Sequence, residues 1–384
     1  MAVKLPVYLD NNATTRTDPR VVEAMLPYFS EDYGNPSSES HAFGWRAEES
    51  LELAREQVAE AVGAASGREV FFTSGATESN NLALQGVAEA LVKRGDHLIA
   101  QETEHPSVLE VLKALARKGR KVSLLPVDAS GQVDPQRLRD TLSKDTVLVS
   151  LMFANNEIGT LQPMAELAQV CGEREVLFHC DAAQATGKVP VDIEALGIDL
   201  LSISAHKMYG PKGVGALVLR KPRQKRDLAP LMFGGPQEAG LRPGTVPVPL
   251  AMGLAKASQL AVEEMAVEST RLRGLTEKLL KTLCAGVPGV ELNGHPSQRL
   301  PGTLNLLFPG IESAKLLAAL PGFALSSGSA CSSGSGDVSH VLLALGRSAT
   351  QARSSLRVGL GRFTKAEEVD QLGEALVQAA LGLR

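Results

Sequence analysis

The sequence predicts an α/β fold in which a mostly parallel sheet is flanked by helices, followed by a smaller α/β C-terminal region. Short apolar segments alternate with amphipathic segments through the first 220 residues, which is typical of a parallel sheet covered on both faces. From about Pro249 to Leu283 strand and turn signals stop, and leucines recur at helical spacing. We interpret this stretch as one long helix that bridges two domains, the number expected for 384 residues.

The predicted elements follow one another in chain order. EVFF (69–72) indicates a short buried strand, and the helix after it has Leu84, Val87 and Leu91 on one face. Pro106 opens the next predicted helix, which ends near Gly119. The remaining segments are strand 97–100, helix 106–119, strand 121–127, helix 134–142, strands 146–154 and 176–181, a short helix, and strands 199–204 and 213–220.

Composition excludes several classes of protein. The chain is 44% hydrophobic and 21% charged, with a net charge of −4, as in ordinary soluble proteins. Its densest basic run, at 220–226, predicts a solvated loop rather than a nucleic-acid surface. The N-terminus lacks the apolar core of a signal peptide, and no apolar run is long enough to cross a bilayer. We therefore expect a cytoplasmic protein without membrane or nucleic-acid partners.

The four cysteines fall into two groups. Cys171, Cys180 and Cys284 lie in apolar periodic segments, so we interpret all three as packing residues. No C-x-x-C pair is present, and we expect neither disulfides nor a metal site. Cys331 differs because it lies in SSGSACSSGSG (326–336), whose serines and glycines supply little apolar surface. The sequence therefore predicts a lone thiol on a flexible loop.

Polar residues follow five of the predicted strands. The segments are TSGATESNN (73–81), ETEHPS (102–107), NNEIG (155–159), DAAQ (181–184) and AHKMYGPKG (205–213). Each alone could hold only a helix cap or a surface residue. Ligands bind at the carboxyl ends of the strands in such sheets, however, so the five together predict a functional site.

The residue types at these strand ends match the needs of pyridoxal phosphate. Small residues at 74–77 lead into a helix, whose free backbone N–H groups can bind a phosphate. Lys207 would form a Schiff base with the cofactor, and Asp181 would keep its ring nitrogen protonated. His105 would stack on the ring, and Gln184 would hydrogen-bond its phenolic oxygen.

Ten segments also carry a family resemblance. They are YLDNNATT (8–15), YGNPSSESHAFG (33–44), FTSGATESNN (72–81), ETEHPSV (102–108), NNEIGTLQP (155–163), DAAQATGK (181–188), SAHKMYGPKG (204–213), GGPQEAGLRPGT (234–245), SSGSACSSGS (326–335) and SSLRVGLGRFT (354–364). In this order they resemble the cysteine desulfurases of the class V aminotransferase group, within the fold-type I pyridoxal-phosphate enzymes. The resemblance runs nearly end to end and is much more specific than any single motif.

The resemblance implies a role for each cofactor residue. Lys207 would carry pyridoxal phosphate. Its phosphate would be bound by Ala76, Thr77, Ser204 and His206, and the ring would contact His105, Asn156, Asp181 and Gln184. The implied large domain covers residues 15–255. The small domain combines 1–14 with 256–384 and carries the cysteine loop.

The resemblance also implies a substrate and a homodimer. Asn156 and Arg357 would hold the carboxylate of L-cysteine, since a guanidinium fork suits a carboxylate. Thr245 would reach the phosphate of the other subunit's cofactor. Lys207 would remove the Cα proton, and Cys331 would take the substrate sulfur as a persulfide, leaving L-alanine. His105 is one candidate for the group that deprotonates the thiol.

The length of the cysteine loop favours the nitrogen-fixation and iron–sulfur-assembly subgroup. Its members would transfer sulfur to an acceptor or scaffold protein. The resemblance leaves open whether Cys331 shares a transient iron–sulfur cluster with the scaffold and whether the sulfur also serves tRNA thiolation. A selenocysteine lyase would use the same Lys207 and Asp181. A class V transaminase has no use for the loop thiol, and a non-catalytic relative predicts loss of one of these three residues, all of which are present.

Overall fold

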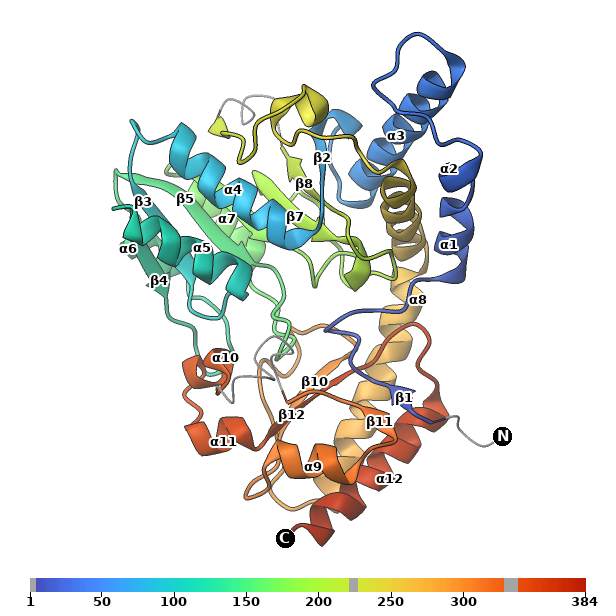
Figure 1. The fold of residues 1–384 in the computed structure, drawn as a ribbon. Helices are drawn as coiled ribbons and strands as arrows, with labels where there is room; N and C mark the ends of the chain where they lie inside the picture. Colours follow the sequence, from blue (N-terminus) through green and yellow to red (C-terminus); the bar gives the residue numbers. More distant parts are fainter. Residues whose placement is uncertain (1–4, 221–226, 328–337) are drawn as a thin grey trace.

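The computed structural model describes residues 5–220, 227–327 and 338–384 (Figure 1). A seven-stranded sheet forms the centre of the larger part, and β8 is antiparallel to both of its neighbours while the other pairings are parallel. Across the sheet the strands are β2 (Val70–Thr73), β8 (Gly215–Leu219), β7 (Leu200–Ser204), β6 (Leu177–Asp181), β5 (Thr146–Met152), β3 (His97–Gln101) and β4 (Lys121–Leu125). The predicted α/β fold with a mostly parallel sheet is confirmed.

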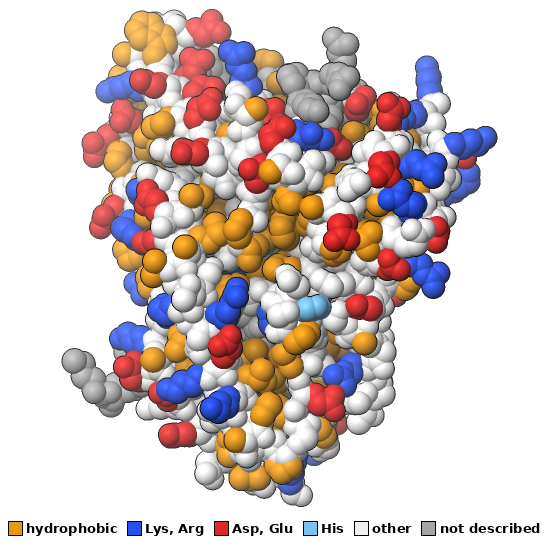
Figure 2. Space-filling view, turned by 180° about the vertical axis from the view of Figure 1, so that it is seen from behind, with side chains coloured by type: hydrophobic (Ala, Val, Ile, Leu, Met, Phe, Trp, Pro, Cys, Tyr) orange, Lys and Arg blue, Asp and Glu red, His pale blue; other side chains and the backbone are white. Residues whose placement is uncertain are grey.

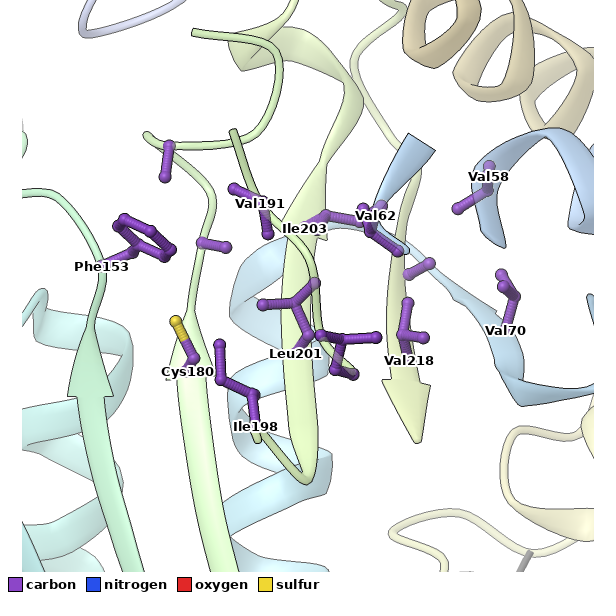
Figure 3. Close-up of a cluster of buried hydrophobic side chains, with 14 of the residues drawn as sticks. Val58, Val62, Val70, Phe153, Cys180, Val191, Ile198, Leu201, Ile203 and Val218 are labelled. Atoms are coloured by element: carbon purple, nitrogen blue, oxygen red, sulfur yellow. The ribbon is translucent and has the colours of Figure 1, made fainter. Parts of the chain in front are cut away.

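Helices cover both faces of this sheet. On one face lie α4 (Ala76–Ala90) and α5 (Pro106–Arg117), which pack on alternate strand residues such as Phe71 and Leu217. The other face meets α3 (Ala42–Ala61), α6 (Pro135–Thr141), α7 (Met164–Gly172) and the first half of α8 (Val248–Gly286). Figure 3 shows side chains of that second layer, among them Phe153, Leu201 and Val218. Burial on both faces explains why the central strands are mostly apolar.

A second core forms around the other half of α8. Leu272, Leu275, Leu279 and Leu283 lie on one stripe of that helix and pack against a three-stranded antiparallel sheet. Its strands are β9 (Glu291–Leu292), β10 (Thr303–Leu307) and β12 (Ser355–Gly359), and α9 (Ser313–Ala319) and α12 (Ala366–Gly382) complete the packing. The predicted long helix is thus present, and Figure 1 shows it joining the two parts.

The N-terminal segment adds to the second core. Strand β1 (Val7–Tyr8) pairs in parallel with β11 (Phe323–Ala324), and the chain then crosses to α1 (Pro19–Met25) and α2 (Pro27–Ser30) beside α8. Two short helices, α10 (His340–Ala344) and α11 (Ala349–Arg353), lie beside the larger part near the strand ends. No described helix has both the length and the apolar character needed to cross a membrane.

Two local predictions are wrong. The short helix expected between β6 and β7 is replaced by turns. Cys284 was expected to pack but is exposed, whereas Cys171 and Cys180 are buried as predicted. Cys284 directly follows Leu283 of the buried stripe, and one residue turns a helix by about 100°, which carries the thiol away from the core. Cys331 and most of its loop lie outside the described residues.

Candidate active site

A cavity of about 510 Å³ lies at the carboxyl ends of the sheet strands. It collects side chains from the loops after β2, β3, β5, β6 and β7, as the order of polar strand ends predicts. The predicted residues that line it are Ala76, Thr77, His105, Asn156, Asp181, Gln184, Ser204, His206, Lys207 and Arg357. Thr245 is exposed and is absent from this lining, and Cys331 lies outside the described residues.

An anion cradle forms where β2 leads into α4. Gly75 caps the helix with φ 144°, a backbone conformation that favours glycine, and Ala76 and Thr77 form the first turn. A Cβ on Gly215 of β8 would lie 2.7 Å from the Gly75 Cα, so the close approach of the two backbones requires a glycine at 215. The first N–H groups of a helix have no partner within it, and here they border the cavity. Glu78 stands nearby, but its charge is paired with Arg242 at 3.0 Å.

Asp181 is held at the end of β6 by two hydrogen-bond donors. Asn80 Nδ2 donates to one carboxylate oxygen at 2.7 Å, and the backbone N–H of Ala183 donates to the other at 3.0 Å. Glu104 lies close beneath it and is fully buried; its burial, and then the charge of Asp181, raise the Glu104 pKa well above the ordinary value. Glu104 accepts a hydrogen bond from the Met152 N–H at 2.6 Å. The site therefore presents one oriented carboxylate to a ligand, with the buried Glu104 side chain and its raised pKa behind it.

Lys207 ends the short 3₁₀ turn after β7, Ala205–Lys207. Its Nζ donates to the carbonyl oxygens of Asn12 at 2.6 Å and Ala13 at 2.8 Å, both from the segment after β1. The adjacent His206 has a pKa lowered to about 4, first by burial and then by the charge of Lys207. At neutral pH the cavity thus contains a lysine amine beside an uncharged imidazole.

His105 caps a helix and also lines the cavity. As the N-cap of α5, its Nδ1 accepts from the Ser107 N–H at 3.1 Å, so the neutral ring carries its proton on Nε2. Burial is the main cause that lowers the His105 pKa. The helix-cap interpretation and the cofactor interpretation of this residue are therefore compatible, because the ring caps with one nitrogen and lines the cavity as well.

Arg357 enters the cavity from β12 of the second core. Its side chain is 1% exposed; Nη2 pairs with Asp10 Oδ1 at 2.7 Å, and Nη1 donates to the Asn156 carbonyl oxygen at 3.0 Å. Nε is buried and has no hydrogen-bond partner among the described residues. A buried cation with an unused donor, facing a cavity, is suited to an anionic ligand group.

Sequence reasoning missed several cavity residues. Asn12, Glu157 and His340 also line the wall. His340 Nε2 meets the Glu104 carbonyl oxygen at 3.0 Å, and Ser339 Oγ donates to Glu157 at 2.6 Å. Asn12 and Glu157 lie in segments already singled out, so a signal existed for them, whereas His340 lies just beyond the cysteine loop (326–336) and belongs to none of the motifs.

The residues fit pyridoxal phosphate. A helix N-terminus that can bind a phosphate, a carboxylate, an imidazole and a lysine amine all border one cavity, as this cofactor requires. A metal cofactor has no comparable support, since the described ranges contain no cluster of three or more metal-binding side chains.

Comparisons with known proteins agree with this geometry. The family model described as Aminotransferase class-V matches residues 7–372. The cysteine desulfurase IscS of Anaeromyxobacter sp. (strain Fw109-5) is 51% identical over 383 residues, covering 100% of this chain and 94% of the relative. The human cysteine desulfurase is 49% identical over 379 residues, covering 99% of this chain and 82% of the relative.

Solved structures show the same likeness. A NifS-like protein superposes with a TM-score of 0.92 at 40% identity, covering 99% of this chain and 100% of that one. A structure described as SspA in complex with cysteine has a TM-score of 0.82 at 36% identity, covering 92% of this chain and 98% of that one.

Proposed function

The chain belongs to the aminotransferase class-V family, and we propose that its cavity converts L-cysteine to L-alanine while the sulfur passes to Cys331 as a persulfide. It is a pyridoxal-phosphate-dependent cysteine desulfurase, an enzyme that mobilises sulfur for iron–sulfur assembly. The observation that carries this function is the convergence of Lys207, Asp181 and the α4 N-terminus on one cavity.

Four groups hold the cofactor in this proposal. The backbone of Ala76 and Thr77 at the α4 N-terminus, with Ser204 and His206, binds the phosphate. Asp181 pairs with the ring nitrogen, and its two donors keep the carboxylate oriented for that contact. When bound, pyridoxal phosphate supplies an electron sink for the charge that develops at the substrate Cα.

The remaining steps use side chains of this chain. Arg357 and Asn156 orient the substrate carboxylate, and Lys207 Nζ accepts the Cα proton. Cys331, as thiolate, forms a bond to the substrate sulfur while the substrate Cβ–S bond breaks. The electron pair of the broken Cβ–S bond stays with the carbon fragment. Protonation of that fragment yields alanine, and the transferred sulfur remains on Cys331 at the sulfane level for delivery to an acceptor or scaffold protein.

We also propose a cytoplasmic homodimer. Thr245 is exposed and is not part of the lining of its own cavity, which supports a contact with the cofactor of a second subunit. Phe233, in the same loop region, is 90% exposed, and Figure 2 shows apolar side chains gathered across the middle of one face. Light scattering should find a dimer at assay concentration, and an active monomer would contradict this part of the proposal.

The function is tested by spectroscopy and product analysis. The purified protein should absorb near about 400 nm, as a lysine-bound pyridoxal phosphate does, and should release alanine from L-cysteine. Lys207→Ala should lose both properties. Lys212→Ala is the matched control, because Lys212 lines the same cavity and should leave the covalent attachment intact. Borohydride reduction and peptide mapping that labelled a lysine other than Lys207 would overturn the assignment.

A further inference from the structure

A chain of hydrogen bonds runs behind the cavity wall from Lys188 to Lys207. Lys188 Nζ donates to Gln184 Oε1 at 2.8 Å, and Gln184 Nε2 donates to the Asn12 carbonyl oxygen at 2.8 Å. Lys207 Nζ donates to the same carbonyl oxygen at 2.6 Å. Gln184, Asn12 and Lys207 line the cavity, whereas Lys188 lies outside its lining and reaches it only through Gln184.

The neighbours of Gln184 determine which way its amide faces. A carbonyl oxygen only accepts, so the amide atom that meets Asn12 must be the nitrogen. A lysine ammonium only donates, so the atom that meets Lys188 must be the oxygen. Both contacts require the same orientation. Nε2 then donates one of its hydrogens to the Asn12 carbonyl oxygen, and its second hydrogen has no acceptor among the described residues.

The surroundings of Lys188 leave it few partners other than this amide. The pKa of Lys188 is lowered to about 7, first by burial and then by the positive charge of Lys207; Glu268 raises it and Arg357 lowers it to smaller extents. Tyr209 and Glu268 border the small cavity on its other side, but no carboxylate in the described ranges lies within 4.0 Å of its ammonium. A neutral amine can also donate to Oε1, so the contact does not require the charged form.

We propose that Lys188 is a positioning residue that holds the Gln184 amide with an N–H directed at the phenolic oxygen of the cofactor. The inference rests on the proposed function, since it assumes pyridoxal phosphate in this cavity. Without Lys188 the amide loses one of the two contacts that orient it. An amide held by a single contact can turn about its side-chain bonds, so its second N–H no longer stays directed at the cofactor oxygen.

The test is a pH titration of the visible absorbance of the holoenzyme. A hydrogen bond to the phenolic oxygen stabilises its anion and weakens its hold on the proton shared with the neighbouring Lys207 nitrogen. Loss of the donor should therefore raise the midpoint, by about one pH unit for a hydrogen bond to a charged acceptor. Lys188→Met and Gln184→Ala should both show this rise.

A double variant separates positioning from a direct effect of charge. If Lys188 acts through Gln184, Lys188→Met combined with Gln184→Ala should shift the midpoint no further than the larger single change. Additive shifts would overturn the inference, because they would mean that the ammonium acts through space. An unchanged midpoint in Lys188→Met would also overturn it.

Two further variants complete the design. Lys188→Arg keeps a donor and should retain the wild-type midpoint, and a raised midpoint there would contradict the role of donation. If Lys188→Met does not fold, as judged by its thermal unfolding, Lys188→Leu takes its place under the same criteria. A wild-type protein with no visible band would instead refute the proposed function, so the two failures are distinguishable.

Discussion

Arg357→Lys tests the substrate contact most directly, because it keeps the positive charge and removes the planar fork. Arg357 already uses Nη2 on Asp10 at 2.7 Å and Nη1 on the Asn156 carbonyl oxygen at 3.0 Å. Its Nε is buried and has no hydrogen-bond partner among the described residues. The guanidinium can therefore bind a substrate carboxylate while it keeps both protein contacts, because its donors are spread over three nitrogens in a plane, whereas those of a lysine all radiate from one atom.

The size of the effect follows from the lost contact. A hydrogen bond to a charged group contributes about 1.5–3 kcal/mol, so losing one of them from the substrate should lower kcat/KM about 10- to 150-fold. The substrate carboxylate does not react and is bound alike before and during the chemical step. Most of the loss should consequently appear as a higher KM for L-cysteine rather than a lower kcat.

The assay measures alanine production over a range of L-cysteine concentrations. Asp10→Asn is the matched control, since it removes the partner's charge and keeps the guanidinium fork, and its KM should not rise. Cofactor absorbance per subunit should match the wild type in both variants. A KM for Arg357→Lys within about twofold of the wild type would refute the reasoning and leave Arg357 as the buried ion-pair partner of Asp10 alone.

Three further results are expected. Cys331→Ser should keep the cofactor and bind L-cysteine but stop sustained alanine release, because a hydroxyl is a poor nucleophile at neutral pH, whereas the exposed Cys284→Ser should behave as the wild type. Near-normal alanine release by Cys331→Ser would favour a lyase that frees its chalcogen without a protein thiol. Glu238→Ala should destabilise the fold by about 3 kcal/mol, seen as a lower midpoint of thermal unfolding, because it leaves the nearly buried Arg55 with only the exposed Glu52 as an ion-pair partner and removes the acceptor of the Phe72 N–H in β2; an unchanged midpoint would contradict this. His179 is fully buried, and burial lowers its pKa to about 4. The unfolded chain binds that proton more readily, so stability should fall by about 3 kcal/mol as the pH drops from about 6.5 to 4, and His179→Gln should flatten this slope in urea unfolding. Parallel slopes would show that other groups are responsible.

The strands and helices could be predicted largely from the sequence, because burial leaves a periodic trace. Strands β5 and β7 are mostly apolar since both of their faces are covered, and α8 keeps its leucine stripe where it meets the second core. The order of the strands was not predictable in the same way. That β8 runs antiparallel between β2 and β7 depends on which edges meet, and periodicity reports only that a face is buried.

The residues of the candidate site also fall into two groups, those that general rules place together from the sequence and those that only the packing brings to the cavity. Lys207, Asp181 and His105 could be placed together because parallel strands end at one edge of a sheet, and a general rule then brings their loops together. Arg357 entered only through the family resemblance, and His340 was not predicted at all. Both come from segments beyond α8, and only the packing of the second core brings them to the cavity.

The sequence by itself determined which groups are available and which faces are apolar, because residue type sets the chemistry and burial sets the pattern. It determined the α/β fold, the long helix and the loops that meet at the strand ends. Tertiary structure alone decided the distances between groups that are far apart in the chain. The hydrogen bond from Lys188 to Gln184 joins residues that are close in the sequence. The hydrogen bonds from Gln184 and Lys207 to Asn12 join segments more than 170 residues apart. No local pattern records such a contact, because it arises from how whole elements pack, and that packing decides which way a single amide faces the cavity.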